Sequence, residues 1–211
     1  MKTDALITLL AQGAGEARPL PVARRLLPAL ALGLALAAVL AVALIGLLPA
    51  SAFASPTPWI KLIPLVLLAG LAWQWMQRSV RPASATRPAL QRLQVLWLVL
   101  ALTGLCSLLF VPAEARMGAL LGGTWWMCPL MLTALALPGL ALVMHSARGL
   151  PVGRAGQAGA ALGLLAGCVA AAGYALACPE SSPAFVALWY SSGLLLCMAL
   201  GAVVGLRRLR W

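Results

Sequence analysis

The chain has 211 residues, of which 63% are hydrophobic and 9% are charged, and its mean hydropathy is +0.99. An ordinary soluble domain carries about 25% charged residues, so this composition excludes that class and indicates an integral membrane protein. The formal net charge of +11 would suggest nucleic-acid binding in a soluble protein. Here the basic residues lie between apolar runs, so we expect a lipid bilayer and no direct nucleic-acid partner.

The first segment, residues 1–23, is predicted to be a cytoplasmic element that precedes the membrane domain. The stretch MKTDALITLLAQ is typical of a short helix, with Thr3 as its cap and Asp4 near the positive helix end. Its apolar flank is formed by Leu6, Ile7, Leu9 and Leu10. Because so short a helix is marginal in water by itself, we expect it to lie on the membrane surface or against a protein partner.

Six apolar runs follow, each about long enough to cross a bilayer as a helix. They lack an alternation of period two, which favours helices over barrel strands. The sequence therefore predicts an all-α polytopic membrane protein, a bundle of six transmembrane helices within residues 24–211. The predicted spans are Leu26–Leu48, Trp59–Met76, Leu93–Val111, Thr124–Met144, Ala155–Cys178 and Pro183–Gly205.

The first run could instead be a signal peptide, because Arg24 and Arg25 precede it and Ala52–Ala54 resembles a cleavage site. A signal-peptide core is usually about 7–15 residues. The run Leu26–Leu48 is longer, so we interpret it as an uncleaved span.

Basic residues give the orientation of the bundle. All but two of the 15 Lys and Arg residues lie before the first span, in the second-to-third or fourth-to-fifth connection, or after the last span. Positively charged loops stay in the cytoplasm, so both termini are predicted to be cytoplasmic. The exceptions are Lys61 and Arg116. Lys61 lies about two residues inside the outer boundary of the second span, where we expect it to snorkel to the headgroups.

Small residues recur at intervals of four in the last two spans. Every fourth residue lies near one helix face, and small side chains there let two helix backbones approach closely. We expect this stripe to pack inside the bundle, with a homodimer seam as the alternative. Its members are Gly159, Gly163, Gly167, Ala171 and Ala175 in the fifth span, and Gly201 and Gly205 in the sixth.

The sequence has few of the residues that catalysis or ion transport requires. The acids Asp4, Glu16, Glu114 and Glu180 all lie outside the apolar centres of the spans, which disfavours ion-coupled transport. The sequence contains no nucleotide-binding loop or metal-binding helix motif, and its one histidine is His145. We therefore expect neither an enzyme nor a bound cofactor.

Two of the five cysteines are predicted to lie near the outer surface, where thiols can be oxidised. Cys128 is near the outer end of the fourth span, and Cys178 ends the fifth. Together they could form a disulfide or bind a soft metal ion, with Glu180 as an added oxygen ligand. Simple packing is the alternative for both. Cys168 and Cys197 lie nearer mid-membrane and are expected to act mainly as small hydrophobic residues, and Cys106 lies about one and a half turns from the outer end of the third span.

Several short motifs along the whole chain resemble the NrsF-type proteins, a family of six-span inner-membrane negative regulators of extracytoplasmic-function (ECF) sigma factors. CPE at Cys178–Glu180, FVALWY at Phe185–Tyr190 and the MKTDALITLL start are the most specific. The others are ARRLL before the first span, WIKL at Trp59–Leu62, Trp126 with Cys128, and LRRLRW at the end.

This resemblance implies that the chain holds an ECF sigma factor inactive at the bacterial inner membrane and releases it under oxidative or heavy-metal stress. It implies sensing by Cys128 and Cys178 and favours the N-terminal segment as the sigma-factor contact, with Thr3, Asp4, Leu6, Ile7 and Leu10 as candidates. The paired Cys and His of a zinc-binding anti-sigma domain are lacking. A membrane thiol oxidoreductase and a small-molecule transporter are the alternatives.

Overall fold

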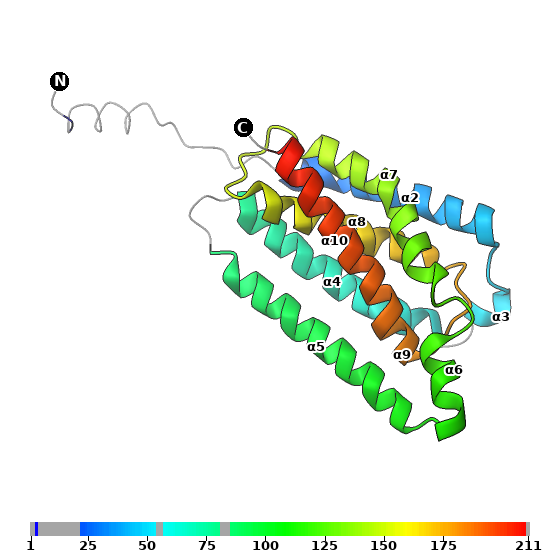
Figure 1. The fold of residues 1–211 in the computed structure, drawn as a ribbon. Helices are drawn as coiled ribbons and strands as arrows, with labels where there is room; N and C mark the ends of the chain where they lie inside the picture. Colours follow the sequence, from blue (N-terminus) through cyan, green and yellow to red (C-terminus); the bar gives the residue numbers. More distant parts are fainter. Residues whose placement is uncertain (1–2, 4–21, 54–56, 81–84, 210–211) are drawn as a thin grey trace.

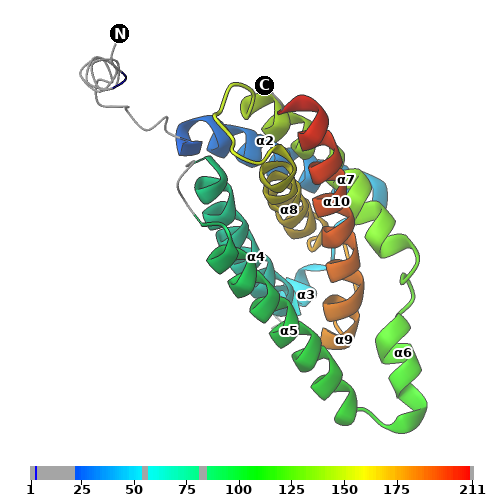
Figure 2. The same ribbon diagram turned by 60° about the vertical axis from the view of Figure 1, so that its left-hand side comes forward.

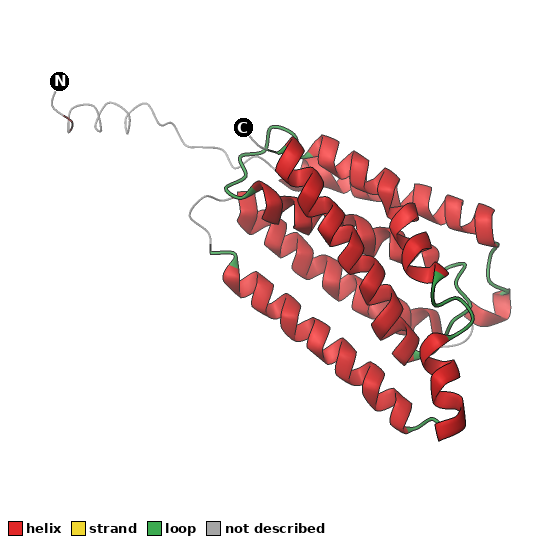
Figure 3. Cartoon of the chain, in the orientation of Figure 1, coloured by secondary structure: helices red, strands yellow, loops and turns green. Residues whose placement is uncertain are grey.

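The computed structural model describes residue 3 and residues 22–53, 57–80 and 85–209, and within these residues every regular element is helical (Figure 3). Six long helices form the body of the molecule (Figure 1). They are α2 (Val22–Ile45), α4 (Thr57–Val80), α5 (Arg87–Leu109), α7 (Met127–Ser146), α8 (Ala155–Tyr174) and α10 (Ser191–Arg208).

Shorter helices lie in the connections at one end of the bundle. Two of them continue directly into α10, so that the last span extends from Pro183 to Arg208. The segment Val186–Tyr190 within it is a π-helix, which is a wider turn than the α-helix on either side. The short elements are α3 (Ala50–Phe53), η1 (Ala113–Ala115), α6 (Arg116–Leu121), α9 (Pro183–Phe185) and η2 (Val186–Tyr190).

The prediction of six apolar helices is confirmed, because the described residues contain six that are long and apolar enough to cross a membrane. Two boundaries differ in an informative way. The third helix begins at Arg87 rather than Leu93, because polar residues can extend a helix beyond its apolar run. The fifth ends at Tyr174, so Cys178 lies in the connection after the helix rather than at its last turn.

Helix α8 lies at the centre of the bundle, where it contacts α2, α4, α7 and α10 (Figures 1 and 2). The glycine stripe produces its closest approach. A Cβ added to Gly159 would lie 2.7 Å from the Cα of Gly205, and one added to Gly163 would lie 2.9 Å from the Cα of Gly201. The stripe therefore packs α8 against α10 within one chain, as expected. The alternative of a homodimer seam on this stripe is wrong, because α10 already covers it.

The outward surface of the long helices is apolar. Leu44, Val66, Leu105 and Leu109 are each more than 60% exposed. A soluble monomer rarely exposes so much contiguous apolar surface, whereas lipid-facing helices require it.

The helix ends carrying most of the basic residues lie together at the end of the bundle where α2 begins and α10 ends (Figure 1). Arg25 of α2 donates from Nη1 to the carbonyl of Arg148, at 3.4 Å, across this end. Helices α3, α6 and α9 lie at the opposite end (Figure 2). We call the first the basic end and the second, where Cys128 and Cys178 lie, the thiol end. Which end faces the cytoplasm, and the division of the chain at residue 23, stay predictions.

Candidate functional site

The two predicted sensor cysteines come together at the thiol end. Cys128 lies in the first turn of α7, where its amide donates to Thr124 O at 2.8 Å. Cys178 lies in the α8–α9 connection, and its amide donates to Tyr174 O at 3.0 Å. Both side chains are buried, at 0% and 1% exposure, and both are free thiols in this structure. Tyr174 contacts the two of them.

Lys61 does not snorkel to the surface as expected. It is only 2% exposed, and its Nζ donates to the backbone carbonyl of Cys178 at 2.6 Å. The ammonium also lies beside the Cys178 thiol. The α8–α9 connection brings the Cys178 carbonyl within reach of Lys61 near the start of α4. A fixed acceptor at short distance therefore replaces the headgroups as the partner of Lys61.

Both tyrosines of the chain pack beside the thiols. Tyr174 ends α8 and Tyr190 ends the π-helix, and their ring centroids are 5.9 Å apart. Tyr190 is 2% exposed and lies against the Cys178 thiol, and its hydroxyl forms no hydrogen bond within the described part of the chain. The sequence did not identify Lys61, Tyr174 or Tyr190 as residues of the candidate site. The signal available was that the chain has just two tyrosines, which flank the CPE motif on either side.

Glu180 joins the α6–α7 connection to the α8–α9 connection, and its charge also acts on Cys128 and Lys61. Its Oε1 accepts from the amide of Gly123 at 2.8 Å and from Thr124 Oγ1 at 3.4 Å. Gly122 has φ +58°, and a Cβ there would lie 2.6 Å from Glu180 Oε2. A glycine is needed at this position because only a residue without a Cβ fits both the backbone and the carboxylate.

No group of three or more Cys, His, Asp or Glu residues suited to a metal ion exists among the residues that the structure describes. The ligation of a soft metal ion by Cys128 and Cys178, and the addition of Glu180 as an oxygen ligand, stay predictions. Two thiols remain suited to either a disulfide or a soft ion.

The other three cysteines do not belong to this cluster. Cys168 and Cys197 are buried at 2% and 1% exposure in α8 and α10, and Cys106 is exposed on α5. Buried thiols among apolar neighbours act as small hydrophobic side chains, which fits the two buried ones.

The proposed sigma-factor contact is largely outside this description. Thr3 is exposed, while Asp4, Leu6, Ile7 and Leu10 lie outside the described residues. Their roles stay predictions.

The chain matches the family described as NrsF, negative regulator of sigma F, over residues 10–211. It is 37% identical over 217 residues to the "Probable anti-sigma-F factor NrsF" of Azospira oryzae, with all of both chains covered. It is 34% identical over 214 residues to the "Anti-sigma-F factor NrsF" of Caulobacter vibrioides, again over the full length of both. No solved structure matches it. From the full-length agreement in sequence, the chain belongs to the NrsF family of negative regulators of sigma F.

Proposed function

We propose that the chain is an integral-membrane anti-sigma factor that sequesters an ECF sigma factor at the cytoplasmic face of the bacterial inner membrane. Oxidation or soft-metal capture at Cys128 and Cys178 would release it. The observation that carries the proposal is a buried pair of free thiols at the end of the bundle opposite the basic end, in a member of a family of negative regulators. The relatives are named as regulators rather than enzymes.

Orientation of the two ends supports a division of labour. The positive-inside rule puts the basic end in the cytoplasm, next to the sigma factor. The thiol end then faces the oxidising side, where a disulfide persists. The N-terminal residues Thr3, Asp4, Leu6, Ile7 and Leu10 would supply the sigma-factor contact, together with the arginine-rich connections of the same end.

The chemistry of the switch balances with a peroxide as oxidant. One thiol loses its proton and attacks the peroxide as a thiolate, and the leaving hydroxide takes up that proton, which gives a sulfenic acid and water. The second thiol then displaces the hydroxyl as a second water to form the Cys128–Cys178 disulfide. A soft divalent ion would instead bind both sulfurs as thiolates and release two protons. Either event joins the first turn of α7 to the α8–α9 connection.

Transmission to the basic end has a suitable carrier in α8. The helix starts at the basic end at Ala155, ends at Tyr174 beside the thiols, and contacts four other long helices. A change from mostly bound to mostly free sigma factor needs about 5.5 kcal/mol of differential stabilisation. A disulfide contributes about 2–4 kcal/mol, so we expect oxidation alone to give partial release.

Co-purification with the sigma factor from membranes tests the proposal. The intact chain should retain the sigma factor and release a measurable part of it after peroxide or cadmium treatment. A Cys128→Ser, Cys178→Ser variant should retain it throughout, and a Cys106→Ser variant serves as the matched control with normal release. Retention of no sigma factor under any condition would refute the anti-sigma function. If the double variant releases the sigma factor as the intact chain does, thiol sensing is refuted but the anti-sigma function is not.

A further inference from the structure

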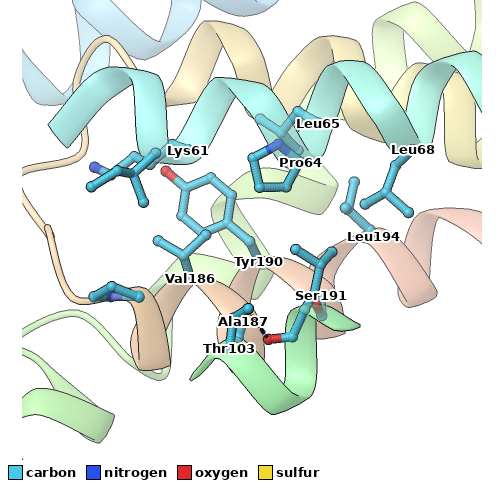
Figure 4. A pocket seen from close by; sticks show the side chains of 13 residues that line it. Lys61, Pro64, Leu65, Leu68, Thr103, Val186, Ala187, Tyr190, Ser191 and Leu194 are labelled. Carbon is cyan, nitrogen blue, oxygen red and sulfur yellow. Dashed lines mark hydrogen bonds between the residues drawn. The ribbon is translucent and has the colours of Figure 1, made fainter. Parts of the chain in front are cut away.

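A cavity of about 70 Å³ lies between α4, α5 and the α9–α10 segment, beside the thiols but separate from them in its lining (Figure 4). One end is lined by Lys61 and Tyr190. The other end is apolar and is lined by Leu65, Leu68 and Leu194. Because Leu65 and Leu68 follow Lys61 on one face of α4, at spacings of four and seven residues, the cavity follows the helix axis away from the ammonium.

The polar end has more donors than strong acceptors, because among the described residues only the Cys178 thiol, a weak acceptor, lies beside both Lys61 and Tyr190 besides the Cys178 carbonyl. The Tyr190 hydroxyl is directed toward Lys61 (Figure 4). Tyr190 is 2% exposed, and among the described residues its hydroxyl forms no hydrogen bond, with only the Cys178 thiol close to it. Lys61 has three N–H donors, of which the Cys178 carbonyl accepts one. A buried positive charge requires a compensating partner. The Glu180 carboxylate acts on Lys61 only at longer range, because its Oε1 is hydrogen-bonded to Gly123 and Thr124. An anionic group with two acceptor oxygens would meet both requirements.

The cavity is open at its rim. Ile60 is 41% exposed, and Thr103 on the facing helix α5 is also exposed. In a membrane this rim faces the acyl chains near the headgroup level. A ligand that enters there must be apolar along most of its length and charged at its end. The volume exceeds that of one water molecule and accepts a small charged group with the first carbons of a chain.

We propose that this cavity binds the ionised carboxylate end of one long-chain fatty acid. The carboxylate accepts hydrogen bonds from Lys61 Nζ and the Tyr190 hydroxyl. Its hydrocarbon chain follows Leu65, Leu68 and Leu194 and continues into the bilayer through the rim. The inference rests on the proposed membrane placement, and it is independent of thiol sensing and of sigma-factor binding.

Photo-crosslinking of the purified full-length chain in neutral detergent tests this site. The probe is a palmitic acid analogue with a diazirine on its chain, and the crosslinked peptides are identified by mass spectrometry. We expect saturable labelling of the α4 and α10 segments that line the cavity. Unlabelled palmitate should compete for it, whereas hexadecanol, which lacks the charge, should compete poorly.

Three variants separate specific binding from general lipid contact. Tyr190→Phe keeps the ring and removes one hydrogen-bond donor to the carboxylate, so the affinity of this variant for palmitate should fall about tenfold. Lys61→Met should abolish saturable labelling. Arg116→Met removes an exposed basic residue of the same end that does not line the cavity, and it should label like the intact chain.

Labelling that rises without saturation, or that is equal in intact and Tyr190→Phe chains, would overturn the proposal. Stronger competition by phosphatidic acid than by palmitate would overturn the single-chain assignment. If Lys61→Met does not fold, the comparisons of Tyr190→Phe and of palmitate with hexadecanol still decide the matter. Failure of the membrane placement is seen separately, as release of the chain from membranes by alkaline carbonate.

Discussion

Replacing Gly163 with alanine tests whether backbone contact holds α8 against α10. The added Cβ would lie 2.9 Å from the Cα of Gly201 and closer still to the carbonyl oxygen of Cys197. Ordinary contacts between carbon atoms need about 3.5–4.0 Å, so α10 must move by roughly 1 Å to accept one methyl group. Both obstacles are backbone atoms, which cannot change rotamer.

The cost follows from this geometry. Overpacking a close-packed interior typically destabilises by about 1–3 kcal/mol, and we expect Gly163→Ala in the upper part of that range. Gly70→Ala is the matched control, because a Cβ at Gly70 of α4 would meet nothing within 4 Å. Removing a helical glycine there should be neutral or should stabilise the chain by up to about 1 kcal/mol.

Thermal unfolding of both variants in the same detergent measures the difference. We expect Gly163→Ala to unfold at a clearly lower temperature than the intact chain, and Gly70→Ala at the same or a higher temperature. Equal stability of the two variants would show that α8 and α10 are not in backbone contact, and the central position of α8 would then be wrong.

Three further predictions concern the thiol end and the orientation. Glu180→Ala should lower stability by about 1.5–3 kcal/mol, because a charged acceptor is lost, and should speed alkylation of Cys178. Glu180→Gln keeps a neutral acceptor oxygen and should show smaller changes in both, so equal behaviour of the two variants would contradict the role of the Gly123 contact. Trp189→Phe removes the bond from Nε1 to Leu120 O, at 2.9 Å, and should lower the unfolding free energy by about 1 kcal/mol; an unchanged denaturation midpoint would argue against that bond. Cysteines introduced at Ala85 and Gly118 into a chain lacking its native cysteines should react with an impermeant maleimide in whole cells at Gly118 alone, and the reverse pattern would invert the proposed topology.

The six helices could be predicted because their signal is local. A run such as Leu26–Leu48 is so long and so apolar that only a membrane-spanning helix fits it. The order of such runs along the chain can be taken directly from the sequence. The glycine stripe was also visible, since it requires only the period of a helix. Its partner was not, because the spacing of small residues identifies a face and says nothing about which helix covers it.

The position of Lys61 could not be predicted from the residues near it in the sequence. Snorkelling is what a lysine does near the end of an isolated span. The carbonyl that binds the Lys61 ammonium belongs to Cys178, 117 residues away in the sequence. It lies in a connection whose position could not be predicted from the sequence. Tyr190 was missed for a related reason, since its position depends on the π-helical turn at Val186–Tyr190. Side chains whose environment depends on distant segments were the ones that local rules placed wrongly or not at all.

Burial of the thiols determines how such a sensor would respond. A thiol buried to the degree of Cys128 or Cys178 reacts only in conformations that open the thiol end. The contacts that oppose opening include the hydrogen bonds of Lys61 to the Cys178 carbonyl, of the Gly123 amide to Glu180, and of Leu48 N to Leu176 O at 3.2 Å. Each 1.4 kcal/mol of opening free energy slows the reaction tenfold. These contacts would therefore set a threshold, so that brief exposure to oxidant leaves the sigma factor bound and sustained stress releases it.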